Sequence, residues 1–178
     1  MDSLYSRYAG ALLSIAMEEN KLDDYRQKIK VYKKLIHENE DIIHLLSSYF
    51  IEKEDKEKII DEIFKDEDLN IVNFIKVVVS NKRANVLEKI MDEFILEVNE
   101  KLNIKDGIVY SVNELDKSQM DALKKNLSIR LNSEVELTNI IDKRLIGGVK
   151  IIVEDKIFDG SVKNKLEKLK ESLISGGK

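Results

Sequence analysis

The chain of 178 residues contains no cysteine, no proline and no tryptophan, and it has only 7 glycines and 2 histidines. The absence of cysteine excludes disulfides, thiolate metal sites and cysteine nucleophiles, and it fits a reducing compartment. Long apolar runs are also missing, since no stretch approaches the roughly 20 residues that a transmembrane helix requires. The first 20 residues carry one arginine and then Glu18 and Glu19, which favours neither a signal peptide nor a transit peptide. These absences favour a cytosolic protein of bacterial type.

Neither basic nor acidic residues are concentrated in any one part of the sequence. The 30 basic and 34 acidic residues are mixed along the chain and give a net charge of -4. A nucleic-acid-binding protein usually has a clustered basic surplus, which this sequence lacks. With 43% hydrophobic and 36% charged residues, the composition is that of a folded globular protein and not of a disordered one.

The first part of the chain has a helical period. From Ser3 to about Asn103, apolar residues recur three and four positions apart, as they do on one face of an α-helix. Polar breaks divide this part into six segments, and these breaks lie near Asn20, Asn39, Glu52, Asp66 and Asn81. Each amphipathic segment must bury one side, so six short helices with short connections predict a helical bundle.

Around Gly107 the period changes from 3.6 to 2. Apolar and polar residues alternate over 108–113, 135–141 and 149–153, which predicts strands. Between the first two, Asp116 and Gln119 have the spacing of a capping box at the start of a helix. The last segment has the spacing of an amphipathic helix. The sequence therefore predicts an α+β, mostly α fold: a six-helix bundle over 1–105 and a small α/β domain over 106–178.

Two adjacent glycines, Gly147 and Gly148, are the first candidates for chemistry. They lack the spacing and the hydroxyl residue of a P-loop, and they lead into a strand instead of a helix. We therefore expect Gly147, Gly148 and the later Gly160 to form structural turns, because glycine adopts a positive φ without steric cost.

No other motif indicates catalysis. His37 and His44, seven residues apart on one helix, would be separated by about 10.5 Å, too far to share a metal ion. The carboxylate clusters fall at helix junctions beside lysines, as solvated caps do, and no serine lies in a GxSxG motif. We predict no catalytic residue, no metal site and no cofactor.

One segment carries a family resemblance. The stretch LIGGVKIIVEDKIFDGSVKNKLEKLKESL, residues 145–173, resembles the carboxyl-terminal signature of the delta subunit of F-type ATP synthases, the family of the oligomycin-sensitivity-conferring protein. The amino-terminal stretch SRYAGALLSIA and the pair Asn81 and Arg83 are also similar to that family. Two departures stand out: Glu154 occupies a turn position where glycine is common, and Val162-Lys163-Asn164 replaces a frequent leucine-arginine-glycine.

The resemblance implies a non-catalytic stator subunit of the peripheral stalk. It would link the catalytic head to the membrane sector of a proton-translocating ATP synthase, so that rotation is coupled to ATP synthesis. The helical domain would bind the amino ends of the alpha subunits, and the smaller domain would bind stalk subunit b. The resemblance also implies one copy per complex at the cytoplasmic face of the cell membrane, with membrane association only through the complex and no contact with nucleic acid.

The same resemblance suggests where the partners bind. The groove for the alpha subunit would lie between the first and fifth helices, and its candidate residues are Tyr8, Ala11, Leu12, Ile15, Ile75, Val78 and Val79. The contact with subunit b would use the final helix, through Val162, Leu166, Leu169 and Leu173.

Two other functions fit the sequence less well. An RNA-binding regulator built on a similar helical bundle would need a basic face, against which the acidic balance argues. A small cofactor-dependent enzyme would need one of the motifs that the sequence lacks.

Overall fold

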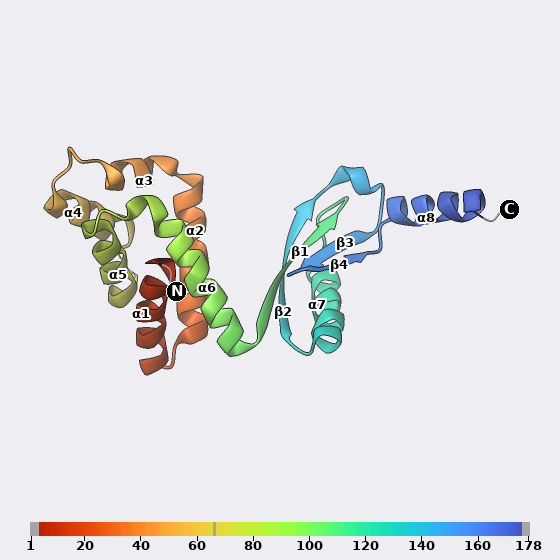
Figure 1. Cartoon of the computed structure of the whole chain (residues 1–178), viewed down its shortest axis with the longest axis horizontal. Helices are drawn as coiled ribbons and strands as arrows, with labels where there is room; N and C mark the ends of the chain where they lie inside the picture. The colour runs from red at the N-terminus through yellow and green to blue at the C-terminus, as the bar shows by residue number, and fades with distance from the viewer. Residues whose placement is uncertain (1–3, 66, 176–178) are drawn as a thin grey trace. The chain divides into compact units, whose positions relative to one another are not determined.

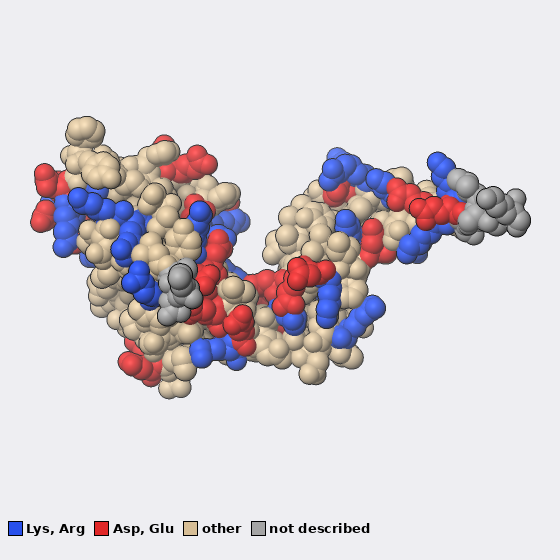
Figure 2. All heavy atoms as spheres, in the orientation of Figure 1, with Lys and Arg blue, Asp and Glu red and all other residues tan. Residues whose placement is uncertain are grey.

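The computed structural model describes residues 4–65 and 67–175, with side chains up to residue 171. The chain divides into two compact units, Met1–Leu102 and Asn103–Lys178. In the space-filling view, basic and acidic side chains are interspersed over both units (Figure 2). None of the helices in the described ranges combines the length and hydrophobicity that crossing a membrane would need.

The first unit is a bundle of α-helices with one short 3-10 turn (Figure 1). Its elements are α1 (Leu4–Glu18), α2 (Leu22–Glu38), α3 (Glu40–Ser47), α4 (Lys53–Ile63), α5 (Leu69–Ser80), η1 (Ala84–Val86) and α6 (Leu87–Leu102). Helix α6 packs against α1 and α2, while α5 packs against α4 and α1. The six-helix bundle predicted from the 3.6-residue period is confirmed.

The core of this unit is built from the apolar stripes of its helices. Leu12 of α1, Tyr25 and Ile29 of α2, and Ile90 and Phe94 of α6 are fully buried in one cluster. Burial of each large apolar side chain contributes about 1.5–3 kcal/mol, so the packing of these faces, more than helix propensity, holds the bundle together.

One charged side chain is also buried in the bundle. Arg26 of α2 is 1% exposed, and its Nη1 donates a hydrogen bond to Asn99 Oδ1 of α6 at 3.0 Å. The same guanidinium pairs with Asp23, with Nη2 2.8 Å from Oδ1. A buried cation is tolerated only when it is paired and hydrogen-bonded, and this set of contacts ties α2 to α6.

The second unit contains a four-stranded sheet with two helices. Its elements are β1 (Ile104–Ser111), α7 (Lys117–Leu131), β2 (Glu134–Ile141), η2 (Lys143–Leu145), β3 (Val149–Val153), β4 (Lys156–Asp159) and α8 (Val162–Ser175). The strand order is β2-β1-β3-β4. Strands β1 and β2 are parallel and connected through α7, and the other two pairings are antiparallel. The α+β, mostly α fold class is confirmed.

Two local features of this unit can be compared with the sequence. The capping box is present, since Gln119 N donates to Asp116 Oδ1 at 2.8 Å and Asp116 N donates to Gln119 Oε1 at 3.0 Å. Strand β4 lies outside the three segments for which the sequence predicts strands. Four residues are too few to establish a period, and they become a strand because they pair with β3 across the two-residue turn Glu154–Asp155.

The glycine corners meet at the start of α8. Gly148 has a φ of 75°, and a Cβ at this position would lie 2.5 Å from the carbonyl oxygen of Gly160. Two backbone hydrogen bonds join the corners to the segments beside them: Val162 N donates to Gly147 O, and Gly160 N donates to Val149 O, each at 2.9 Å. The beginning of α8 is thereby fixed beside the amino-terminal end of β3.

Candidate partner-binding groove

A groove of about 470 Å³ lies between α1 and α5 in the helical unit. Apolar side chains form most of its lining, and polar groups stand at its two ends. The lining residues are Arg7, Tyr8, Ala11, Leu12, Ile15, Asn70, Asn73, Phe74, Val77 and Arg83. A concave apolar surface with a few polar groups at its edges is typical of a binding site.

The wall from α1 is the one that the sequence predicts. Tyr8, Ala11, Leu12 and Ile15 follow one another at spacings of three, one and three, and all four line the groove. Leu12 is fully buried and belongs to both the groove and the bundle core, whereas Ala11 is exposed. Because alanine is small, the backbone of α1 is open to close approach by a partner at this point.

The wall from α5 differs from the sequence prediction. Ile75 and Val78 are fully buried and Val79 is 4% exposed, so these three residues pack into the core of the bundle and do not line the groove. The groove is lined instead by the face that carries Asn70, Asn73, Phe74 and Val77. Successive residues of a helix are rotated by about 100° around its axis. Neighbouring residues such as Phe74 and Ile75 therefore lie on different faces of α5.

The sequence contains a signal for this face. Helix α5 is apolar on more than one side, so a count of apolar spacings does not identify the side that remains open. Asn70 and Asn73, three residues apart, are the polar positions in the first half of this apolar run, and both line the groove, whereas Lys76 and Ser80 in the second half do not. Val77 continues that face and is 51% exposed.

A basic group stands at one end of the groove. The guanidinium of Arg83 donates a hydrogen bond to the Tyr8 hydroxyl, and its central carbon lies 5.1 Å from the centroid of the Tyr8 ring. Arg7, the residue before Tyr8 on α1, also lines this end of the groove and is exposed. This end of the groove therefore favours an acidic or hydrogen-bond-accepting group on the partner.

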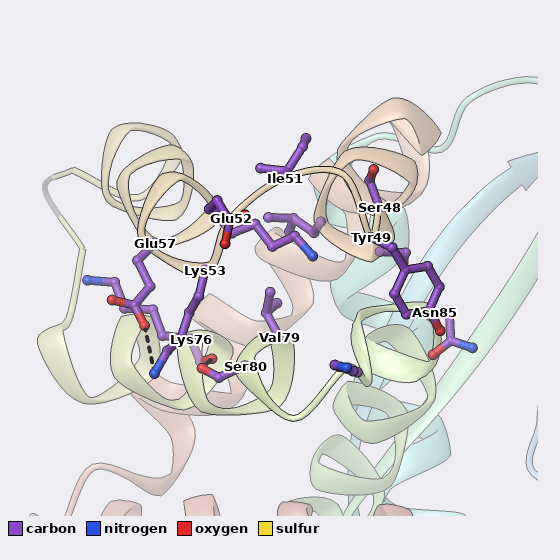
Figure 3. Close-up of a pocket in the computed structure, with 14 residues that line it drawn as sticks. Ser48, Tyr49, Ile51, Glu52, Lys53, Glu57, Lys76, Val79, Ser80 and Asn85 are labelled. Carbon is purple, nitrogen blue, oxygen red and sulfur yellow. Dashed lines mark hydrogen bonds and ion pairs between the residues drawn. The ribbon is translucent and has the colours of Figure 1, made fainter.

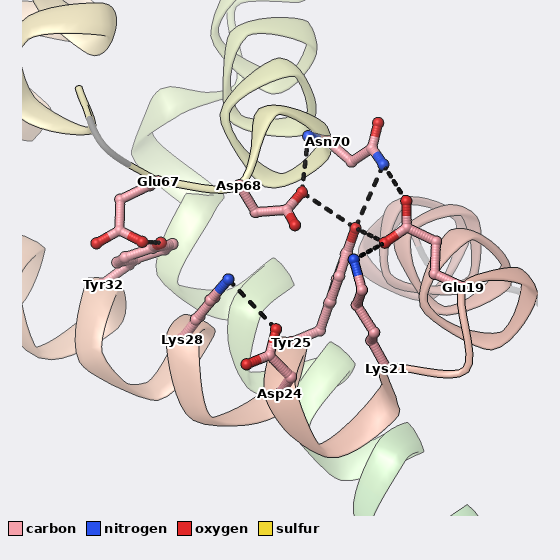
Figure 4. A network of polar contacts seen from close by, with 9 residues as sticks. All are labelled: Glu19, Lys21, Asp24, Tyr25, Lys28, Tyr32, Glu67, Asp68 and Asn70. Atoms are coloured by element: carbon pink, nitrogen blue, oxygen red, sulfur yellow. Dashed lines mark hydrogen bonds and ion pairs between the residues drawn. The ribbon is translucent and has the colours of Figure 1, made fainter.

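A network of carboxylates and hydroxyls closes the other end (Figure 4). Asn70 Nδ2 donates to Glu19 Oε1 at 2.7 Å, which joins the start of α5 to the residue that follows α1. Tyr25 OH lies 3.0 Å from Glu19 Oε2 and 3.2 Å from Asp68 Oδ1, and it can donate its single hydrogen to one of them at a time. Asp68 also caps α5 by accepting a hydrogen bond from Asn70 N at 3.0 Å.

The protonation states in this network follow from burial and hydrogen bonding. Burial raises the pKa of Tyr25, so its hydroxyl remains a neutral donor. Hydrogen bonds from Lys21 and Tyr25 lower the pKa of Glu19, which stays ionised. Tyr32 donates a hydrogen bond to Glu67, and burial likewise raises the pKa of Tyr32. Together these contacts hold the segment before α5 against α2 and fix one end of the groove.

The final helix exposes the apolar stripe that the sequence predicts for a second partner. Val162, Leu166 and Leu169 of α8 are 38%, 53% and 60% exposed. The side chain of Leu173 lies outside the described residues. Near its start the helix is held by Asn164, whose N donates to Ser161 Oγ at 3.1 Å and whose Nδ2 donates to the Asp159 carbonyl at 3.0 Å.

A second cavity, of about 430 Å³, lies on another part of the helical unit (Figure 3). It is formed by the α3–α4 connection, the start of α4 and the end of α5, and Val79 contributes to its lining. Within the described residues, no group of three or more His, Asp or Glu side chains is arranged to hold a metal ion.

Comparison with known proteins gives a consistent result along the whole chain. The family model described as the ATP synthase delta (OSCP) subunit matches residues 4–173. A Mycoplasma mobile protein named ATP synthase subunit delta is 39% identical over 168 residues, which are 94% of this chain and 93% of that protein. A protein of the same name from Clostridioides difficile is 33% identical over 170 residues, with 94% of each chain covered.

Among solved structures, the fold is similar to that of a chain in the cryo-EM structure of the Toxoplasma gondii mitochondrial ATP synthase hexamer. The TM-score is 0.67, and the match covers 97% of this chain and 98% of the other. The two sequences are 17% identical, so this likeness concerns the fold alone.

Proposed function

Because the chain belongs to the ATP synthase delta (OSCP) family, we propose that its α1–α5 groove binds the amino-terminal segment of an alpha subunit and that α8 binds stalk subunit b. The chain is a non-catalytic stator subunit of the peripheral stalk in an F-type ATP synthase, a membrane-associated complex. It is not an RNA-binding regulator. We place one copy in each complex, at the cytoplasmic face of the membrane.

The groove between α1 and α5 is the observation that carries the proposal for the alpha subunit. Its apolar floor suits the apolar face of an amphipathic helix, a common form of peptide recognition. Its length also fits such a helix, because its lining on α1 runs from Arg7 to Ile15, eight residues or about 12 Å, which is roughly two helical turns. The basic and acidic ends would then fix the position of the partner along the groove.

The mechanism in this proposal is mechanical. Rotation of the rotor performs work on the catalytic sites only while the head is prevented from turning with it. A tether between head and stator must therefore dissociate slowly, and nanomolar affinity corresponds to about -12 kcal/mol. Burial of apolar surface in a groove can supply such affinity without any chemical step.

Binding of an alpha-subunit peptide tests this proposal. We expect a synthetic peptide from the amino end of the alpha subunit to bind the full chain in calorimetry, with an affinity that changes little with salt because the floor is apolar. Ala11→Glu should weaken binding at least tenfold, since it places a charge on the α1 wall of the groove. Ala122→Glu, at an exposed alanine of α7, is the matched control and should have no effect. Equal binding by both variants would contradict the groove assignment.

A further inference from the structure

The α3–α4 connection presents two aromatic side chains to solvent. Tyr49 is 84% exposed and Phe50 is 98% exposed, so neither contributes to the core of the bundle. Phe50 N donates a hydrogen bond to Ser48 Oγ at 3.2 Å, which helps to shape the turn that carries it. A single exposed apolar residue needs no explanation. Here, however, two consecutive aromatic residues stand beside a cavity, and Tyr49 is part of its lining (Figure 3).

The lining of this cavity is rich in lysine. Lys53 and Lys56 come from α4, Lys76 comes from α5, and Lys82 follows α5. Against these four lysines the lining contains two glutamates, Glu52 and Glu57. We call these four lysines, together with Tyr49 and Phe50, the α3–α4 surface. A group of basic side chains over α4 and α5 is visible in the space-filling view (Figure 2).

Part of this positive charge has no acidic partner. Lys53 lies 3.6 Å from Glu57, and Lys76 lies 2.6 Å from Asp61. Lys82 Nζ lies 5.8 Å from the centroid of the Tyr49 ring. Within the described residues, neither Lys56 nor Lys82 forms an ion pair with a carboxylate. The surface is therefore locally positive on a chain whose net charge is -4.

The lining of the cavity also contains a hydroxyl group without a hydrogen-bond partner in the described part of the chain. Ser47 also lines the cavity, and its Oγ is buried without a hydrogen-bond partner among the described residues. Buried polar groups in folded proteins nearly always have a partner, and each exception calls for an explanation. A carboxylate in the cavity can pair with the lysines, whereas the buried Oγ would become a donor to it only after the lining around Ser47 opens.

We propose that the α3–α4 surface is a second docking site, which binds an acidic segment of the catalytic head. A carboxylate of the partner enters the cavity beside Lys56 and Lys82, and Phe50 packs against the partner outside it. A small anion would fill the cavity and leave Phe50 in solvent, whereas a protein segment covers both. This inference rests on the proposed stator function, and it adds a contact separate from the α1–α5 groove.

The test uses the full chain and the purified catalytic head from which this subunit has been removed. Phe50→Ser should weaken binding at least fivefold, because an apolar contact is lost. The double variant Lys56→Glu, Lys82→Glu should weaken binding at least tenfold, and its affinity should depend less on salt than that of the unmodified chain. Matched controls on α2 are Val31→Ser, at a side chain 63% exposed, and Lys34→Glu, at a side chain 76% exposed. Neither control should change the affinity.

The possible outcomes separate this inference from the proposed function. If the α3–α4 variants bind the head as the unmodified chain does while Ala11→Glu weakens binding, the second docking site is wrong and the groove assignment stands. If only Phe50→Ser has an effect, the acidic character of the partner is wrong. If the unmodified chain does not bind the head at all, the proposed function itself fails. Circular dichroism of each variant checks that the bundle remains folded.

Discussion

Gly148 shows how one residue determines a corner of the second unit. Its φ of 75° lies in the region that favours glycine, and the carbonyl of Gly160 occupies the place of a side chain. A phosphate-binding loop would direct several backbone N–H groups at one point. Here the Gly147 carbonyl instead accepts a hydrogen bond from Val162 N at the start of α8. The double glycine therefore joins the sheet to the final helix.

Replacing this glycine should damage one unit only. Gly148→Val is expected to destabilise the second unit by about 3 kcal/mol or more, because it adds a positive-φ penalty to a clash with the Gly160 carbonyl. Chemical denaturation followed by NMR resonances from each unit measures the effect. Gly10→Ala, in α1 with no atom within 4 Å of the added Cβ, is the control and should stabilise the helical unit by about 0.5–1 kcal/mol. If Gly148→Val unfolded both units together, their independence would be refuted.

An ion pair between Arg144 and Asp142, near this corner, gives a prediction about pH. The Arg144 side chain donates two hydrogen bonds of 2.8 Å to the Asp142 carboxylate and lowers the pKa of that carboxyl from 3.8 to about 2. A lowered pKa in the folded state favours folding at pH values above about 4, and this contribution is lost as the pH falls from about 4 towards 2.

Arg144→Gln should raise the pKa of Asp142 part of the way to its ordinary value, since the backbone N–H of residue 144 still donates to the carboxylate at 3.0 Å. An NMR titration of the side-chain carboxyl measures this value. Lys143→Gln removes a neighbouring positive charge without removing a hydrogen bond, so it should change the pKa less. An equal shift in the two variants would show that general charge, and not the Arg144 contact, lowers the pKa.

At the scale of elements, α5 shows why a helix can be predicted while its binding face is not. The spacing of its apolar residues predicts the helix, but α5 is apolar on several sides. Its neighbours α1 and α4 decide which side is buried. That choice depends on packing between segments far apart in the sequence, so Ile75 and Val78 enter the core while Asn73 and Val77 face the groove.

Helix α8 provides a test at this scale. Leu166 and Leu169 are more than half exposed, so the double variant Leu166→Gln, Leu169→Gln should change the stability of the chain by less than about 1 kcal/mol. If α8 binds subunit b, the same variant should weaken binding to the carboxyl-terminal part of that subunit at least tenfold. Calorimetry measures both quantities. Lys165→Gln, Lys168→Gln on the same helix is the control, and equal loss of affinity there would contradict an apolar contact.

The whole molecule consists of two units with separate cores. The buried residues form one cluster in the helical unit and another around Val109, Leu127 and Val153 in the sheet unit. Because these cores lie in chain segments that divide after Leu102, each unit can bury its apolar residues by itself. Two units also suit the proposed function, in which each unit binds a different partner.

Independent cores predict independent unfolding. We expect calorimetry to show two transitions, and fragments 1–102 and 103–178 to give NMR spectra that together reproduce the spectrum of the full chain. The first fragment alone should bind the alpha-subunit peptide as tightly as the full chain does. A single transition with unfolded fragments would contradict the division, and a folded first fragment that ignores the peptide would argue against the groove.

The sequence by itself determined the kind and order of most elements, because the spacing of apolar residues is a local property of the chain. It also determined the family, through the LIGG segment at 145–148, the DGS segment at 159–161 and the leucine-periodic helix that follows. It did not predict β4, which lies between Gly148 and Gly160. Only the tertiary structure decided which face of α5 is open, how Glu19, Tyr25 and Asn70 close the groove, and where the lysines of α4 and α5 meet. These features depend on contacts between segments distant in sequence. Packing between helices decides which apolar face is buried, and the local spacing of apolar residues does not contain that information.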